Sequence, residues 1–305
     1  MLAGDLLTPT LRSHFRVLYR RQRLLGKSEE TIRLYEAAIN DFDSIHERES
    51  TIHDLTDEGV IALMQSILDR GCCNRSANRA RECIVALWNF LARKRIVETY
   101  PDVPRLPEPR EDPVAWTQPE LRVLFQACTD SPGYIGDMTA ARYWLILHSL
   151  LWNSADRIKP VRLCRCENLN LATGWGTFPA KMRKGKMESN TFRMDETTIE
   201  LIRPVYQTSG LLLPWPYTWT YIYNLYNKLL VRAGLPHDKF RKFHAVRKSA
   251  GSWIKAAGGD ATAALGHSSE RITRRHYIDP TIGPSQQPCD ILFRPDRHDD
   301  GPRAA

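Results

Sequence analysis

The sequence has 305 residues, of which 42% are hydrophobic, and its 43 Lys and Arg outweigh 35 Asp and Glu to give a formal net charge of +8. This length suffices for two domains with separate cores. The basic character favours nucleic acid or another polyanion, because bound cationic side chains release the counterions of phosphates. No apolar run approaches the roughly 18 residues of a membrane span, and the stretch MLAGDLLTPTLRSHFRV lacks the apolar core of a signal peptide. We therefore expect a cytoplasmic protein with no membrane partner.

The cysteines show neither a disulfide nor a zinc pattern. Their odd number in a chain of this length argues against a secreted disulfide framework. The spacing in Cys164-Arg165-Cys166 is not that of a zinc knuckle, and no matching Cys/His pair follows it. We expect reduced, mostly structural cysteines and no metal. They are Cys72, Cys73, Cys83, Cys128, Cys164, Cys166 and Cys289.

Residues 1–100 are predicted to form a small bundle of four amphipathic helices. Ser and Thr cap helix starts and proline fits the first turn, which indicates where each helix begins. The expected starts are Thr8-Pro9, Ser28, Thr56 and about Ser76. The expected buried faces are Leu11, Phe15 and Leu18; Ile32, Tyr35, Ile39 and Phe42; Val60, Ile61, Met64, Ile67 and Leu68; and Ala80, Cys83, Ile84, Leu87, Trp88 and Leu91.

Basic residues lie near the starts of these predicted helices, where the helix dipole and the side chains both suit phosphate. They are Lys27, Arg33, Arg75 and Arg79, which we predict to contact DNA. A basic face exposed only to solvent is the alternative for each of them.

The segment PDVPRLPEPREDP contains five prolines and cannot continue a helix. It predicts a stiff linker over residues 101–115, after which Thr117 and Glu120 form a capping box. The predicted organisation is a helical domain over 1–100, the linker, a second domain over 116–280 and an extended tail over 281–305.

The second domain is predicted to be mainly helical with a small β-hairpin, an α+β arrangement. The strand-like segment is 174–194, which contains a Lys-Gly-Lys turn. The predicted helices are 118–129, 137–152, 157–165, 195–207, 217–233 and 244–257.

Two stretches of this domain carry residues suited to phosphate chemistry. FHAVRKSAGSWI places His244 and Arg247 on one helix face, and LGHSSERITRRHY runs from His267 through three arginines to Tyr277. Breaking a phosphodiester without a metal requires fixed cations on the non-bridging oxygens, and the arginine fork binds such oxygens well. A tyrosine, whose phenol titrates at about 10, becomes a competent nucleophile beside cations and a base.

These motifs resemble the signature of the tyrosine recombinase (phage integrase) family: a first-box Arg, a Lys on a β-hairpin, His-x-x-Arg, Leu-Gly-His-Ser and a nucleophilic Tyr. HAVR, LGHSS and RRHYIDP match the last three, and the resemblance covers about residues 140–280. The first domain is similar to the family's core-binding domain. The spacing of ten residues from His267 to Tyr277 is one longer than the commonest in the family, which predicts a shift of the tyrosine by one helical step.

The same resemblance assigns the first-box arginine to Arg157, which follows an apolar helix as Arg-Ile does in the family; Arg162 and Arg165 are the alternatives. Pro160 stands where the family usually has an acid that helps to orient the site, so the support around the site is expected to differ.

For the hairpin lysine, the resemblance favours Lys184 in Lys-Met-Arg-Lys-Gly-Lys, with Lys186 and Lys181 as alternatives. We also predict Lys186 to contact DNA. A basic turn in solvent is the structural alternative.

The resemblance implies a site-specific DNA recombinase of the integrase type, acting on double-stranded DNA at the nucleoid as a homotetramer on two sites, without a cofactor or a small-molecule substrate. The implied roles are Tyr277 as nucleophile, Arg157, Arg247 and His267 as ligands of the scissile phosphate, His244 as an aid to proton transfer from Tyr277, and Lys184 as general acid for the leaving 5′-oxygen. The tail patch Cys289-Asp290-Ile291-Leu292-Phe293 is a candidate for docking on a neighbouring protomer, and a disordered tail with incidental apolar residues is the alternative.

Two other functions stay open. A type IB topoisomerase would share the chemistry but reseal the same strand, and a DNA-binding protein with a decayed site is suggested by Pro160 and the longer spacing. A zinc site of His244, His267 and His276 would lack a thiol or carboxylate pattern and would leave the arginines unexplained.

Overall fold

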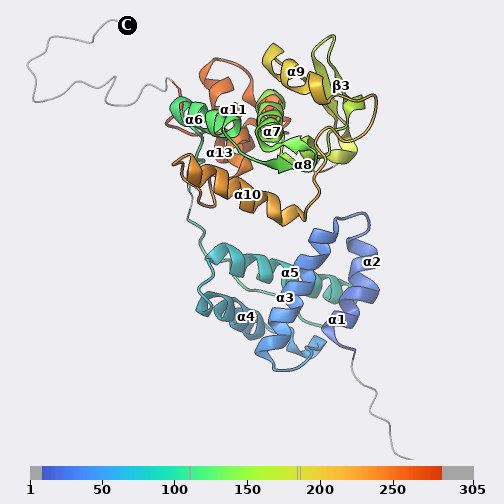
Figure 1. Cartoon of the computed structure of the whole chain (residues 1–305). Helices are drawn as coiled ribbons and strands as arrows, with labels where there is room; N and C mark the ends of the chain where they lie inside the picture. The colour runs from blue at the N-terminus through green and yellow to red at the C-terminus, as the bar shows by residue number, and fades with distance from the viewer. Residues whose placement is uncertain (1–8, 110, 184, 186, 284–305) are drawn as a thin grey trace, which may run out of the picture. The chain divides into compact units, whose positions relative to one another are not determined.

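The computed structural model describes residues 9–109, 111–183, 185 and 187–283. The chain divides into two compact units, Met1–Arg110 and Glu111–Ala305 (Figure 1). Each unit has a hydrophobic core of its own. Lys184, Lys186 and the tail segment Ile291-Leu292-Phe293 lie outside the described residues.

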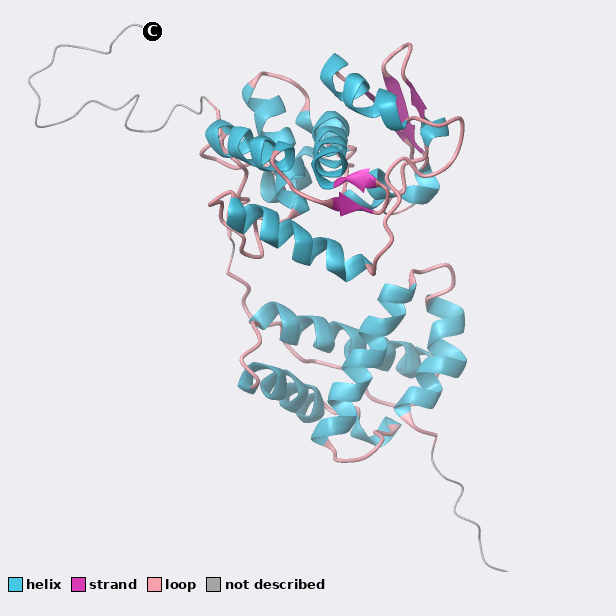
Figure 2. Ribbon diagram, viewed as in Figure 1, coloured by secondary structure: helices cyan, strands magenta, loops and turns pink. Residues whose placement is uncertain are grey.

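The described part of the first unit is helical (Figure 2). Its elements are α1 (Leu11–His14), the π-helical η1 (Phe15–Tyr19), α2 (Arg20–Arg23), α3 (Glu29–Ile45), the short 3-10 helix η2 (Ile52–Asp54), α4 (Asp57–Asp69) and α5 (Asn74–Arg93). Ser28 and Thr56 cap α3 and α4 by accepting hydrogen bonds from backbone N–H groups, as predicted. Thr8, the expected cap of the first helix, lies outside the described residues; Pro9 is not helical, and Thr10 caps α1.

The predicted apolar faces form the core of this unit, with one exception on α4. Ile61 is 51% exposed, whereas Leu63, which was not expected in the core, is fully buried. At 3.6 residues per turn Leu63 shares a face with Val60 and Met64, and Ile61 falls beside that face.

The beginning of the proline-rich segment packs on α5. Val103 is buried in the core of the first unit. Asn78 accepts a hydrogen bond from the N–H of Leu106 and donates one to its carbonyl, both at 2.9 Å, and Arg81 Nε donates to the carbonyl of Val103 at 2.9 Å. The backbone N–H and C=O groups of an extended proline-containing segment have no partners within the segment, so side chains of α5 form hydrogen bonds with them. Part of the predicted linker therefore belongs to the first unit.

The second unit combines helices with two small antiparallel sheets (Figure 2). Its longer helices are α6 (Gln118–Thr129), α7 (Ala140–Ser154), α10 (Trp219–Arg232) and α11 (Phe243–Ala256). Its short helices are α8 (Ile158–Arg162), η3 (Cys166–Asn168), η4 (Ala180–Met182), α9 (Glu196–Ile202), η5 (Arg203–Val205), α12 (Ala261–Leu265) and α13 (Glu270–His276). Its strands are β1 (Tyr134–Ile135), β2 (Met138–Thr139), β3 (Leu169–Asn170), β4 (Trp175–Phe178) and β5 (Asn190–Arg193).

Three features of this unit position the site. The apolar helix α7 is largely buried and ends at Ser154; the next residue, Ala155, has a left-handed φ of 48° and turns the chain toward Arg157. The predicted strand segment forms the β4–β5 hairpin, in which Gly176 pairs with Phe192 and the connecting loop contains Arg183. The described part of the loop faces the end of α7 through Arg183.

The β1–β2 hairpin and the helices α12 and α13 were not predicted. Ser269 begins α13 by accepting a hydrogen bond from the N–H of Ile272, but the seven residues of this helix are mostly charged. They lack an apolar stripe, so periodicity gives no signal for them.

Within the described residues, no helix is long and apolar enough to cross a membrane. The cysteines there, six in number, are free, and no group of three or more His, Cys, Asp or Glu could hold a metal ion.

The close packing of Gly176 yields a stability prediction. A Cβ at this position would lie 2.6 Å from Phe192 Cζ and 2.8 Å from Leu169 Cδ2. We expect Gly176→Ala to lower the free energy of unfolding of the second unit by about 1–3 kcal/mol, because buried neighbours must shift. Chemical denaturation measures the change. The exposed Thr173→Ala is the control, with an expected change below about 0.5 kcal/mol. Equal stabilities of the two variants would contradict the packing argument.

Candidate active site

The side chain of Tyr277 lies in a cluster of cations and imidazoles. Its residue follows the last turn of α13, and its ring is only 6% exposed. Arg157 Nη2 lies 3.3 Å from Tyr277 Oη, and the guanidinium carbon of Arg247 lies 5.2 Å from the centre of the ring. The rings of His267 and His244 have their centroids 4.3 Å and 5.2 Å from that of Tyr277. The structure thus brings together these five residues, and the longer spacing before Tyr277 is accommodated.

The backbone around Tyr277 is fixed to α11. Ser252 Oγ donates a hydrogen bond to the carbonyl of Tyr277 at 3.1 Å and accepts one from the N–H of Asp279 at 2.9 Å. The buried carboxylate of Asp279 in turn accepts from the N–H of Ala115 at 2.7 Å. These contacts hold the tyrosine segment against the helix that carries His244 and Arg247.

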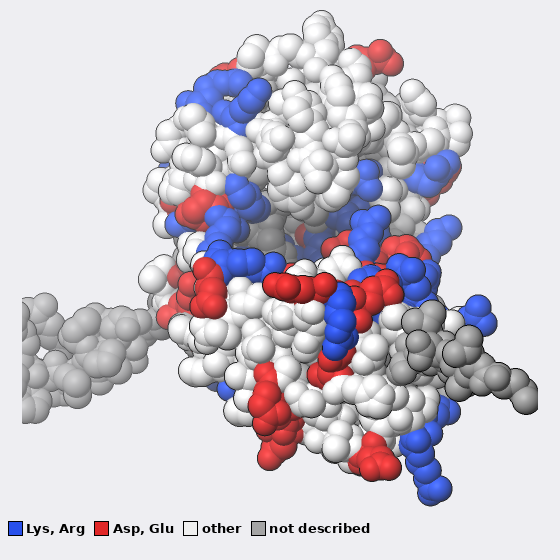
Figure 3. Space-filling view, turned by 90° about the horizontal axis from the view of Figure 1, so that it is seen from below, with Lys and Arg blue, Asp and Glu red and all other residues white. Residues whose placement is uncertain are grey.

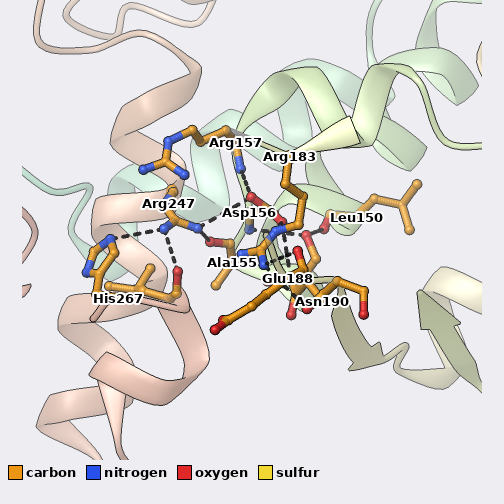
Figure 4. Close-up of polar contacts among 12 residues, drawn as sticks. Leu150, Ala155, Asp156, Arg157, Arg183, Glu188, Asn190, Arg247 and His267 are labelled. Atoms are coloured by element: carbon orange, nitrogen blue, oxygen red, sulfur yellow. Dashed lines mark hydrogen bonds and ion pairs between the residues drawn. The ribbon is translucent and has the colours of Figure 1, made fainter. Parts of the chain in front are cut away.

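Arg247 is fully buried and is held by backbone carbonyls (Figure 4). Its Nη1 donates to the carbonyl of Ala155, and its Nη2 donates to the carbonyl of Leu265 at 2.6 Å. Its Nε is buried and has no hydrogen-bond acceptor among the described residues. Because an unmet buried donor costs free energy, this nitrogen is suited to a substrate oxygen.

The hydrogen bonds of His267 define its tautomer. Thr273 Oγ1 donates to the carbonyl of Ser269 at 3.4 Å, so its oxygen accepts from His267 Nδ1–H, 2.9 Å away. Nε2 is then the unprotonated nitrogen, and it accepts from Arg247 Nη2 at 3.1 Å. In this arrangement His267 orients Arg247.

Both histidines are poor proton acceptors in the free protein. The pKa of His244 is lowered to about 4, mainly by the loss of hydration and then by the positive charges of Arg247, Lys248 and Arg157. Part of this residue is nevertheless open to solvent. Burial, followed by the charges of Arg247 and Arg157, lowers the pKa of His267 to about 4. Both imidazoles are therefore neutral at pH 7.

Sequence reasoning missed Asp156, whose buried carboxylate contacts two arginine side chains and the backbone N–H of a third arginine (Figure 4). Its Oδ1 accepts from the backbone N–H of Arg157 at 2.7 Å and lies 3.6 Å from Arg247 Nη1. Its Oδ2 accepts from Arg183 Nε at 2.7 Å. Its position directly before Arg157 was the available signal.

The alternatives for the first-box arginine are engaged elsewhere. Arg162 stacks over Trp219 at 4.2 Å, and Arg165 pairs with Glu167 at 3.2 Å. Among the described lysines, Lys181 is exposed on the hairpin loop. Lys248 was also missed: it lies one helical turn after His244, and burial lowers its pKa.

The predicted DNA-binding residues of the first unit are all exposed. Lys27 precedes α3, Arg33 lies on α3, and Arg75 and Arg79 lie one turn apart on α5. Acidic groups accompany two of these: Arg33 lies 3.8 Å from Glu30, and Arg75 lies 3.3 Å from Glu108. Figure 3 likewise shows basic and acidic side chains interspersed over the face that it presents.

The fold is that of known integrases. The integrase of the Tn1549 transposon, solved with a circular intermediate DNA, matches with a TM-score of 0.69 at 13% identity, over 87% of this chain and 94% of that chain. A lambda integrase dimer bound to a COC' core site matches with a TM-score of 0.67 at 13% identity, over 91% and 80%. A lambda integrase tetramer bound to a Holliday junction matches with a TM-score of 0.65 at 15% identity, over 92% and 81%. No family model and no curated protein matches the sequence. The predicted mainly helical fold with small sheets, resembling that of tyrosine recombinases, is confirmed.

The neutral histidines predict how stability depends on pH. Their pKa is lowered from 6.5 in the folded state, so below pH 6.5 the unfolded chain binds protons that the folded chain does not. The free energy of unfolding of the second unit should therefore fall as the pH drops from 6.5 toward 4. We expect His267→Gln to show a shallower fall in denaturant titrations.

The exposed His237→Gln is the matched control, since it removes an imidazole outside the cluster. Equal pH slopes for the His267 and His237 variants would contradict the assignment of the cluster as the source of this dependence.

Proposed function

We propose that this chain is a site-specific DNA recombinase of the integrase type, which cleaves and rejoins DNA through a 3′-phosphotyrosyl intermediate. The observation that carries the proposal is the contact between Arg157 Nη2 and Tyr277 Oη at 3.3 Å, with Arg247 stacked on the same ring. A tyrosine hydroxyl among guanidinium groups is arranged for attack on a phosphate. The DNA complexes of the integrases that share the fold support the same substrate class.

In the proposed reaction, Tyr277 Oη attacks the scissile phosphorus and loses its proton. The bond from phosphorus to the 5′-oxygen breaks, and that oxygen leaves as a hydroxyl after it takes up a proton from a general acid. A 3′-phosphotyrosyl bond replaces the broken bond. Attack by a 5′-hydroxyl of another strand reverses the same steps, so no cofactor or external energy is consumed.

Each residue of the cluster has a role in this scheme. Arg157 and the free Nε of Arg247 would bind the non-bridging oxygens and offset the charge that develops there. His244, which is neutral, would accept the proton of Tyr277. His267 would act on the phosphate only through Arg247, whose guanidinium it holds at Nε2, because its Nδ1–H is already donated to Thr273.

The remaining roles extend the proposal. Lys184, which lies outside the described residues, would be the general acid, with Lys186 or Lys181 as substitutes. Lys27, Arg33, Arg75, Arg79 and Lys186 would contact the DNA backbone, which supplies most affinity and little specificity. Strand exchange between two sites would require four protomers at the nucleoid, and the lambda integrase tetramer on a Holliday junction supports this stoichiometry.

A covalent trap in cells tests the proposal. DNA that stays attached to denatured protein would be recovered and its ends sequenced, for wild type and for Tyr277→Phe. We expect adducts at recurring sequences with wild type and none with Tyr277→Phe, because only the hydroxyl forms the bond. Tyr134→Phe, at a 70% exposed tyrosine, is the control and should retain adducts.

Each other outcome points to a different function. Adducts scattered without sequence preference would identify a type IB topoisomerase. DNA binding without adducts would identify a protein with a decayed site, and in both cases the recombinase proposal would be overturned.

The two arginines should be needed for chemistry more than for binding. On a site recovered from the trap, we expect Arg157→Lys and Arg247→Lys to slow cleavage by about 10²–10³-fold, since lysine lacks the fork that holds phosphate oxygens. DNA affinity, measured by fluorescence anisotropy, should change little. The exposed Arg203→Lys is the matched control. Wild-type cleavage rates in both site variants would exclude these residues from the reaction.

A further inference from the structure

We propose that Asp156 and Arg183 are positioning residues, whose buried ion pair ties the described limbs of the β4–β5 loop to the end of α7, beside Arg247. This inference rests on the proposed function and deepens it, because it names two residues outside the family motif that hold the site residues in position.

The pair differs from the surface ion pairs of the described chain. The Asp156 side chain is fully buried and that of Arg183 is 9% exposed, with Arg183 Nε 2.7 Å from Asp156 Oδ2. The Arg203–Glu200 pair, by comparison, has side chains 59% and 61% exposed. Water screens an exposed pair, so that pair contributes little, whereas a buried pair holds its geometry because separation would strand a charge.

Arg183 also forms hydrogen bonds with the other side of its own loop, the side that leads into β5 (Figure 4). Its Nη1 donates to the carbonyl of Glu188 at 3.2 Å and to that of Ser189 at 3.4 Å. Asn190 Nδ2 donates to Asp156 Oδ2 at 3.3 Å. Both limbs of the loop are therefore tied to one carboxylate at the end of α7.

The guanidinium of Arg183 also lies against the turn that leads into His267. A Cβ on Gly266 would stand 2.9 Å from Arg183 Nη2, so the guanidinium lies directly against this turn. Asp156 Oδ1 meanwhile reaches Arg247 Nη1 at 3.6 Å. The pair thus connects the loop to α11 and to the Leu-Gly-His-Ser turn.

Asp156 provides a carboxylate where Pro160 provides none. Pro160 is buried in α8 and has no polar side-chain atom to orient the site. Asp156 is placed directly before Arg157 and binds its backbone N–H at 2.7 Å. One carboxylate facing Arg157, Arg183 and Arg247 leaves the cluster positively charged, as a phosphate site requires.

The pair has a specific consequence for the reaction. The loop that Arg183 holds is the loop on which the general acid is predicted, so loosening it should impair protonation of the leaving 5′-oxygen. The pair of Asp156 with Arg247 should instead affect phosphate binding. We therefore expect Arg183 variants to impair protonation of the leaving oxygen, and Asp156 variants to impair phosphate binding as well.

The test compares two DNA substrates that carry a site recovered with the wild-type protein. One has oxygen and the other sulfur at the 5′-bridging position of the scissile phosphate. A thiolate leaves without a proton, since a thiol titrates far below an alcohol. A defect in the general acid therefore slows cleavage of the oxygen substrate and spares the sulfur substrate.

We expect Arg183→Met to slow cleavage of the oxygen substrate by about 10²–10³-fold and cleavage of the sulfur substrate by less than about threefold. Asp156→Asn should slow cleavage of both, because it also disturbs Arg247. Arg203→Met is the matched control and should cleave both at wild-type rates. Circular dichroism and DNA affinity would verify that each variant is folded.

If Arg183→Met fails to fold, Arg183→Lys replaces it in the test. Lysine keeps the charge but lacks the fork that reaches Glu188 and Ser189, so it too should slow cleavage of the oxygen substrate and spare the sulfur substrate. Equal slowing of both substrates, or wild-type rates on both, would overturn the inference and leave the recombinase function standing. If wild type forms no adduct with either substrate, the proposed function itself fails.

Discussion

The second unit depends on one buried cation, the guanidinium of Arg247. A charge without water is costly unless hydrogen bonds and a counter-charge surround it. Here the carbonyls of Ala155 and Leu265 and the carboxylate of Asp156 supply them. These groups belong to segments far apart in sequence, and none of them is in place until the chain has folded. The folding of this unit and the assembly of its cationic site are therefore one process.

The two carbonyls lie where helices end, and this location explains why they can accept hydrogen bonds from a buried guanidinium. Ala155 follows α7 and Leu265 ends α12, and each helix ends at a left-handed residue, Ala155 with φ 48° and Gly266 with φ 60°. The last carbonyls of a helix lack intrahelical partners and carry partial negative charge. Arg247 thus satisfies the ends of two helices at once, and the turns that expose these carbonyls also lead directly to Arg157 and His267.

Sequence reasoning succeeded where local chemistry determines structure. Ser28, Thr56 and Thr117 cap helices because capping depends on residues three positions apart, and the His-x-x-Arg pair lies on one helix for the same reason. It failed where tertiary contacts decide. Asp156 looked like an ordinary polar residue, since its partners Arg183 and Arg247 lie on a hairpin and on a distant helix.

The depressed basicity of His244 fits a site that responds to its substrate. Apart from lost hydration, its pKa is lowered by the positive charges of Arg247, Lys248 and Arg157. A DNA phosphate between the two arginines would offset those charges and raise the pKa of the imidazole toward its ordinary value. The base would then be strongest when a scissile phosphate is bound beside Tyr277, and weak when the site is empty. The arginines that we propose to bind the phosphate would in this way also control when the tyrosine loses its proton.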